Sequence, residues 1–102
     1  LDPLHYAMLA TRGFTHMLRG EDAEAARWTE RGARSPGAHV LIAMVAAAAH
    51  ALSGDGTRAA FWATNARERN PKLTQEDFFR AFPMRSNPMR SRVERALGAL
   101  GF

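Results

Sequence analysis

The chain has 102 residues, enough for one small domain, and its 46% apolar and 24% charged residues are ordinary for a folded protein. It contains no cysteine, which excludes disulfides, thiolate nucleophiles and cysteine-bound metal centres, and which suits a reducing, cytoplasmic compartment. Since 14 basic residues stand against 10 acidic ones, the formal net charge is +4.

Two helices are predicted in the first third of the chain. Asp2 can cap and Pro3 can open the first helix, whose apolar residues recur at helical spacing until Gly20 ends it. The second helix begins with acidic residues, which suit the positive end of the helix dipole, and it ends with Arg31 and Arg34 before a Ser-Pro-Gly turn. The two helices are therefore expected to form an antiparallel pair.

The next segment repeats this design. A helix over residues 38–53 is followed by a Gly-Asp-Gly break and by a further helix that closes at Asn70 and Pro71. The apolar run over residues 40–49 falls well short of the roughly 20 residues that span a bilayer, so it predicts a buried helix and no membrane span. No stretch alternates apolar and polar residues between turn signals, so we expect no strand.

Two shorter helices are predicted in the last third. Thr74 and Asp77 form a capping-box pattern that opens the first of them, and Pro83 ends it. Asn87 can cap and Pro88 can open the final helix. Their apolar residues are Phe78, Phe79 and Phe82 in the first helix and Met89, Val93, Leu97 and Leu100 in the second. These stripes are expected to cap the preceding helices.

The first two thirds of the chain contain an internal repeat. Shifting the sequence so that His5 falls on His39 aligns seven identical pairs, which include both tryptophans. The pairs are His5 and His39, His16 and His50, Leu18 and Leu52, Gly20 and Gly54, Ala25 and Ala59, Ala26 and Ala60, and Trp28 and Trp62. The tryptophan, histidine and glycine matches do not follow from the high alanine content, so the repeat is taken as real.

Small residues also recur at matching places in the two periods. They are Gly13, Ala25 and Gly32 in the first period and Ala47, Ala59 and Ala66 in the second, with Pro36 and Pro71 near the two ends. This pattern resembles the tetratricopeptide repeat family, which has the same period of about 34 residues and whose helices approach closely at small residues.

The resemblance implies an all-α fold, a short α-solenoid of two tetratricopeptide-like antiparallel helix pairs. Residues 1–36 and 37–71 would form the two repeats, and residues 72–102 a short helix and a capping helix of the same single domain. The chain departs from the family pattern where a tryptophan is usual, because Leu9 and Ala43 stand there.

By the same resemblance we expect an interaction module that binds a protein or peptide and has no catalytic activity or cofactor of its own. The inner surface of the solenoid would be formed by Ala10, Phe14, Met17, Met44 and Ala48. These are adaptable apolar contacts for a helix or an extended peptide. Two alternatives stay open, in which the chain's own phenylalanines or a preceding repeat fill this surface.

A narrower resemblance concerns the arrangement of the whole chain. Two divergent repeats, a linker rich in phenylalanine and proline, and a last helix near Phe102 are similar to the C-terminal region of certain bacterial regulators. In those proteins the repeats follow a class III adenylate/guanylate cyclase domain or a winged-helix domain. The alternative function is therefore a regulatory region of a signalling enzyme or transcriptional regulator.

The chain begins at Leu1 without a leader, so we expect a fragment whose open N-terminal face meets another domain, a partner or a second copy.

Basic residues cluster near the C-terminus and form a predicted basic rim. Its members are Arg85, Arg90, Arg92 and Arg95, with Arg80 nearby. No recognition-helix pattern or aromatic ladder accompanies them, so a solvated helix face or an acidic protein partner is favoured over nucleic acid.

The four histidines are the remaining candidates for chemistry. His5 shares a helix face with His16, and His39 with His50, because eleven residues make about three helical turns. No cysteine or well-spaced carboxylate completes a zinc site. We favour the interpretation that His16 and His50 replace a packed tyrosine, and we expect no metal and no catalytic residues.

Overall fold

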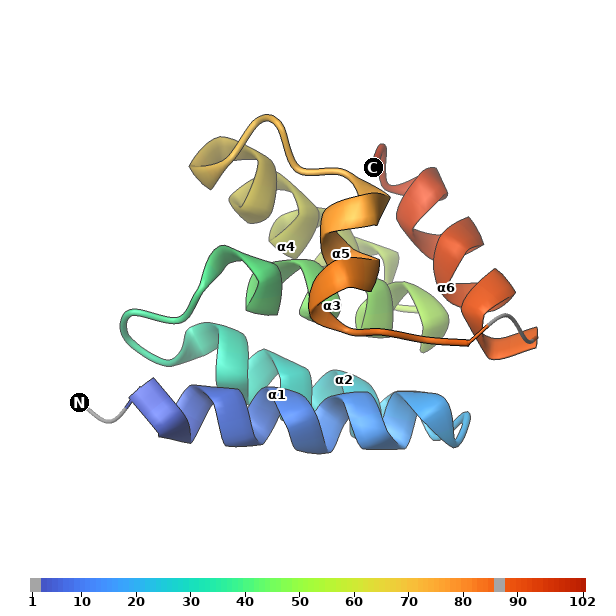
Figure 1. Cartoon of the computed structure of the whole chain (residues 1–102), viewed down its shortest axis with the longest axis horizontal. Coiled ribbons are helices and arrows are strands. Elements are labelled where there is room, and N and C mark those ends of the chain that lie inside the picture. Colours follow the sequence, from blue (N-terminus) through green and yellow to red (C-terminus); the bar gives the residue numbers. More distant parts are fainter. Residues whose placement is uncertain (1–2, 86–87) are drawn as a thin grey trace.

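The computed structural model describes residues 3–85 and 88–102, in which all regular structure is helical and no strand occurs. The helices are α1 (Pro3–Leu18), α2 (Asp22–Arg34), α3 (Val40–Leu52), α4 (Gly56–Arg69), α5 (Gln75–Ala81) and α6 (Pro88–Ala99) (Figure 1). The prediction of an all-α protein is confirmed. The predicted caps Asp2 and Asn87 lie outside the described residues.

The turns that end α1 and α3 are built in the same way. Gly20 and Gly54 have φ values of 75° and 87°, a backbone conformation that only glycine adopts without strain. The residue after each glycine donates its backbone N–H to a carbonyl group of the helix that has just ended. Glu21 donates to the His16 carbonyl at 3.0 Å. Asp55, one repeat later, makes the same bond to the equivalent histidine carbonyl of α3 at 2.9 Å. The chain therefore reverses direction in the same manner at both places.

Side-chain caps fix three helix starts. Asp55 accepts from the Arg58 amide at 3.0 Å at the start of α4. At the start of α5, Thr74 and Asp77 form the capping box that the sequence predicts. Helix α3 begins at Val40, two residues later than expected, because the ring of His39 caps it by accepting from the Leu41 amide at 3.1 Å.

The first four helices form a row in which each one contacts the next (Figure 1). Helix α3 is the centre of the molecule, since it also contacts α1, α5 and α6. All residues from 42 to 50 are buried, on every side of this helix. Its alanine-rich sequence allows neighbours to approach on all sides, because methyl groups take little space. None of the described helices is both long and apolar enough to cross a membrane.

Two glycines set the spacing between α1 and α2. A Cβ atom at Gly13 would overlap the Cγ2 atom of Thr29 and lie 2.9 Å from the Thr29 amide nitrogen. A Cβ atom at Gly32 would lie 3.2 Å from the carbonyl oxygen of Tyr6. The backbones of the two helices therefore meet directly, as expected for small residues at a helix crossing.

The C-terminal helices fold back onto α3. Phe78, Val93 and Leu97 are fully buried in the main core cluster. Arg92 of α6 reaches Asp22 of α2, with 2.8 Å between its Nη2 and Oδ2. This pair joins two helices that are 70 residues apart in sequence, so the C-terminal segment is an integral part of the fold.

Candidate interaction surfaces

The predicted inner surface lies inside the molecule. Ala10, Met17, Met44 and Ala48 have at most 1% of their surface exposed. Phe14 is half-buried, and its ring centroid lies 5.2 Å from that of Phe82. These residues belong to the core of this structure and are not on a surface that a partner could contact.

The chain's own phenylalanines cover this surface. Phe78 of α5 lies in the same cluster as Met17 and Met44, and its ring contacts those of Phe79 and Phe82 at 5.2 and 5.3 Å. Of the alternatives that the sequence leaves open, the structure therefore has the one in which the C-terminal segment fills the inner surface. The physical reason is that α5 folds back over α3, which no local sequence pattern specifies.

The predicted basic rim is divided between two roles. Arg90 donates to the Met84 carbonyl at 2.7 Å and to Glu94 at 2.9 Å, and its guanidinium lies 4.1 Å from the ring centre of Phe79. Arg92 holds Asp22, as described above. Arg85 and Arg95 are exposed. Half of the rim therefore stabilises the fold, and only the other two arginines face solvent.

A polar cluster that the sequence did not reveal joins α2, α3 and α4 at Glu30. The Oε1 atom of Glu30 lies 2.8 Å from Nε2 of His50 and 3.3 Å from Nε1 of Trp62, both of which donate to it. Its Oε2 atom accepts from Nε of Arg34 at 3.1 Å. No local sequence signal predicts this cluster, because its members come from three different helices and because His16 and Trp28, with the same spacing, share no acceptor among the described residues.

The charge state of Glu30 follows from these bonds. Burial acts to raise the pKa of its carboxyl group, but the hydrogen bonds from Trp62, His50 and Arg34 outweigh burial and hold the pKa below its ordinary value. Glu30 is therefore an ionised acceptor that ties three helices together. It borders a shallow cavity of about 450 Å³, whose lining includes Arg27, Arg31 and Arg58.

Trp28, the equivalent of Trp62 one repeat earlier, has no such acceptor. Its indole Nε1 is buried and has no hydrogen-bond partner within the described residues. Two guanidinium groups lie against the ring, that of Arg12 at 4.1 Å and that of Arg31 at 4.8 Å from the ring centre. A buried N–H without an acceptor is uncommon and costs free energy, so this side chain marks an incomplete contact.

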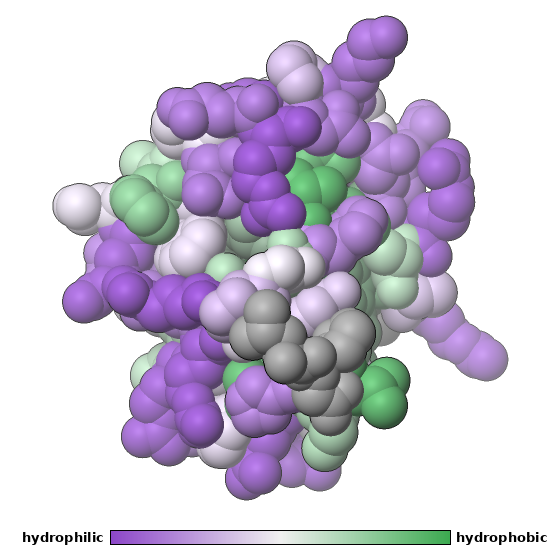
Figure 2. All heavy atoms as spheres, turned by 90° about the vertical axis from the view of Figure 1, so that its left-hand side faces the viewer, coloured by the Kyte–Doolittle hydropathy of each residue, from purple (hydrophilic) through white to green (hydrophobic). Residues whose placement is uncertain are grey.

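The large apolar side chains that remain exposed lie at the two ends of the helix row. Leu4, Met8 and Leu18 of α1 are 69%, 70% and 46% exposed, and Phe61 of α4 is 60% exposed. Figure 2 views the molecule from the side at which α1 begins, and apolar areas lie there between hydrophilic ones. We call the exposed side of α1, with Met8, Thr11, Thr15 and Leu18, the α1 end face.

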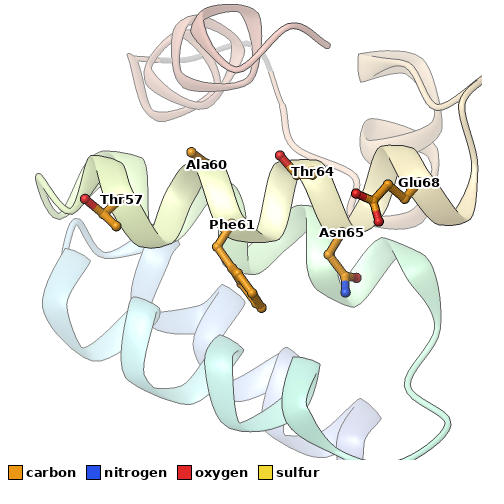
Figure 3. A pocket seen from close by; sticks show the side chains of 6 residues that line it. All are labelled: Thr57, Ala60, Phe61, Thr64, Asn65 and Glu68. Carbon is orange, nitrogen blue, oxygen red and sulfur yellow. The ribbon is translucent and has the colours of Figure 1, made fainter.

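The opposite end of the row is a shallow groove on α4, which we call the α4 end face (Figure 3). Its volume is about 370 Å³, and its lining residues are Thr57, Ala60, Phe61, Thr64, Asn65 and Glu68. The ring of Phe61 stands edge-on to that of Trp62, with 5.0 Å between the centroids. The groove is open, and its lining combines apolar side chains with polar ones, as surfaces that bind protein segments often do.

The remaining histidines have structural or solvent-exposed positions. His16 lies 2.9 Å from Glu21, His39 caps α3, and His5 is exposed. Within residues 3–85 and 88–102, no three His, Asp or Glu side chains come together as metal ligands would.

Comparisons with protein-family models, with curated proteins and with solved structures find no match.

Proposed function

We propose that the chain is a protein-interaction module of tetratricopeptide-like helices without a catalytic activity of its own. The observation that carries this proposal is the position of its exposed large apolar side chains, which lie on the outermost helices of the row, α1 and α4. Apolar side chains exposed at both ends of a stacked array are typical of surfaces that bind further helices.

The repeat positions support the tetratricopeptide-like part of the proposal. All six small residues of the pattern are buried: Gly13, Ala25, Gly32, Ala47, Ala59 and Ala66. The contact of α1 with both α2 and α3 is also the arrangement expected when successive helix pairs stack. The C-terminal segment occupies the inner surface, so the proposed interaction uses the exposed faces of α1 and α4 instead.

The proposal can be tested by selecting binders from a library of helical peptides displayed on phage, with the intact chain as bait. Selected peptides should bind the chain, and at least one group should lose about tenfold or more in affinity on Met8→Glu or Phe61→Glu, which bury a charge in the contact. Ser91→Glu, at an exposed position of α6, is the matched control and should change nothing. If no binder is selected, or if none responds to either end-face variant, the proposal is wrong.

A further inference from the structure

The two helix pairs use equivalent positions in different ways. Ile42 and Val45 of α3 are buried, and Ile42 packs against α2, with its Cγ2 atom 3.4 Å from where a Cβ atom of Gly32 would lie. Their equivalents one repeat earlier, Met8 and Thr11 of α1, are exposed. The α1 end face is therefore equivalent to the surface that α3 presents to α2, but no described helix covers it. Figure 1 shows α1 at the edge of the helix row.

The histidine and tryptophan of the two helix pairs also differ in whether they share a hydrogen-bond acceptor. His50 and Trp62 both donate to Glu30 of α2. Among the described residues, their equivalents His16 and Trp28 share no such carboxylate. The Nε1 atom of Trp28 is buried without an acceptor. His16 uses its Nδ1 atom for Glu21, and in the part of the chain that the structure describes its Nε2 atom makes no hydrogen bond.

The charges around Trp28 favour an acidic group. Arg12 and Arg31 lie against its ring, whereas the equivalent positions around Trp62 hold Ala46 and Asn65. Helix α1 contains no acidic residue. The equivalent of Arg58, which lies 3.7 Å from Glu30, is Glu24, and its charge is compensated by a bond of 3.0 Å from Arg27. Two guanidinium groups, those of Arg12 and Arg31, thus lie where a carboxylate would enter.

We propose that the α1 end face binds an acidic helix of a partner protein. One Glu or Asp of this helix accepts a hydrogen bond from His16 Nε2 and, after the guanidinium groups of Arg12 and Arg31 move aside from the ring, a second one from the buried Trp28 Nε1. Small residues on either side of this carboxylate pack on Met8, Thr11 and Thr15. The partner helix thus resembles the side of α2 that contacts α3, with a carboxylate flanked by small residues. A second copy of this chain does not supply it through its α4 end face, because Thr64 stands there at the position equivalent to Glu30. This inference rests on the proposed interaction function and names its partner.

The probe for this proposal is a synthetic peptide with the sequence of residues 21–35. A hydrocarbon staple replaces the side chains of Ala25 and Thr29, which face α1 in the intact chain and are free to carry it in the peptide. The peptide is added to the intact ¹⁵N-labelled chain, whose two tryptophans give two indole N–H signals in the NMR spectrum. The Trp28 signal should shift on binding, and the Trp62 signal should not.

Two variants test the carboxylate. A peptide with Glu30→Gln should bind about tenfold more weakly or worse, because charge-assisted hydrogen bonds are lost. Trp28→Phe in the chain should weaken binding of the original peptide about fivefold and should reduce the difference between the two peptides. Ser91→Glu in the chain should leave both affinities unchanged.

Three results would overturn the proposal. The first is a Trp28 signal that does not move at millimolar peptide, and the second is equal affinity for the original peptide and its Glu30→Gln version. The third is a shift of the Trp28 signal with the chain's own concentration in the absence of peptide, which would assign the surface to a second copy. If library peptides bind the end faces while the α2 peptide fails, the interaction function stands and the acidic-helix proposal falls.

Discussion

The first helix pair, α1 and α2, and the second, α3 and α4, have the same local design and different surroundings. Gly20 and Gly54 end α1 and α3 with the same left-handed turn. Yet α3 is buried on every side, whereas one side of α1 is exposed. Local sequence thus determines where each helix begins and ends, and neighbouring helices determine which of its faces are core.

The comparison is sharpest at the two tryptophans. Trp62 donates its indole N–H to Glu30, and Trp28 has no acceptor for the same atom among the described residues. The same residue at the same repeat position is therefore a satisfied core side chain in one pair and an incomplete contact in the other. Substitutions made at equivalent positions should reveal this difference directly.

The largest effect is expected at the close approach of α1 and α2. Gly13→Leu should lower the free energy of unfolding by about 3 kcal/mol, because a side chain there meets the backbone of Thr29. Ala47→Leu, at the equivalent position of α3, should also destabilise, because Ala47 is fully buried. Urea unfolding followed by circular dichroism measures both.

Gly98→Ala is the control for the glycine prediction. A Cβ atom at this exposed helix position meets only the side-chain end of Gln75, at 3.6 Å. The substitution should stabilise the protein by up to about 1 kcal/mol through helix propensity. If Gly13→Leu costs no more than a surface substitution, the close crossing of α1 and α2 is incorrect.

The two histidines should differ next. His50→Ala should cost about 2 kcal/mol, since it removes a buried ring and one of the bonds to the Glu30 carboxylate. His16→Ala should cost less than about 0.5 kcal/mol, because its pair with Glu21 is more exposed. Thermal and urea unfolding of the two variants would show equal losses if the repeats were packed equivalently.

The tryptophans should give a smaller difference of the same kind. Trp62→Phe should destabilise by about 1 kcal/mol, because Glu30 loses a donor. Trp28→Phe should be within about 0.5 kcal/mol of the original chain or slightly more stable, because it removes a buried N–H for which the described residues supply no acceptor. A cost at Trp28 as large as that at Trp62 would mean that its N–H is satisfied.

The smallest expected effect is a dependence on pH. The pKa of Glu30 is lower in the folded chain than its ordinary value of 4.5, so the unfolded state binds the proton more readily. Stability from this group is therefore complete above about pH 5 and is lost as the pH falls through the folded pKa. Glu30→Gln should reduce the loss of stability between pH 6 and pH 3, measured by urea unfolding. An unchanged pH profile would contradict the lowered pKa.

The helices can be predicted well from sequence because their ends carry local signals. Gly20 and Gly54 mark helix stops, and Thr74 with Asp77 marks a start, in each case through contacts within a few residues. The sequence places the start of α3 two residues too early because a histidine is an unusual cap, and His39 performs that role here.

The candidate surfaces cannot be predicted in the same way. The sequence predicts that Met17 and Met44 face a groove, but they are covered by Phe78 from a distant part of the chain. It also predicts Arg92 on an exposed rim, but Arg92 pairs with Asp22, 70 residues away. Such contacts depend on how the C-terminal segment folds back, and helical periodicity says which residues share a face but not what covers it.

The most direct test duplicates residues 4–37 ahead of Leu4, so that an added helix with the sequence of α2 precedes α1 by one period of the repeat. In the original chain Met8→Glu should cost less than about 0.5 kcal/mol, because Met8 is exposed. In the duplicated chain the same substitution at the second copy of Met8 should cost about 2 kcal/mol or more, because a charge would be buried against the added helix. Equal costs in the two chains would contradict the claim that the α1 end face is an unfilled helix-binding surface.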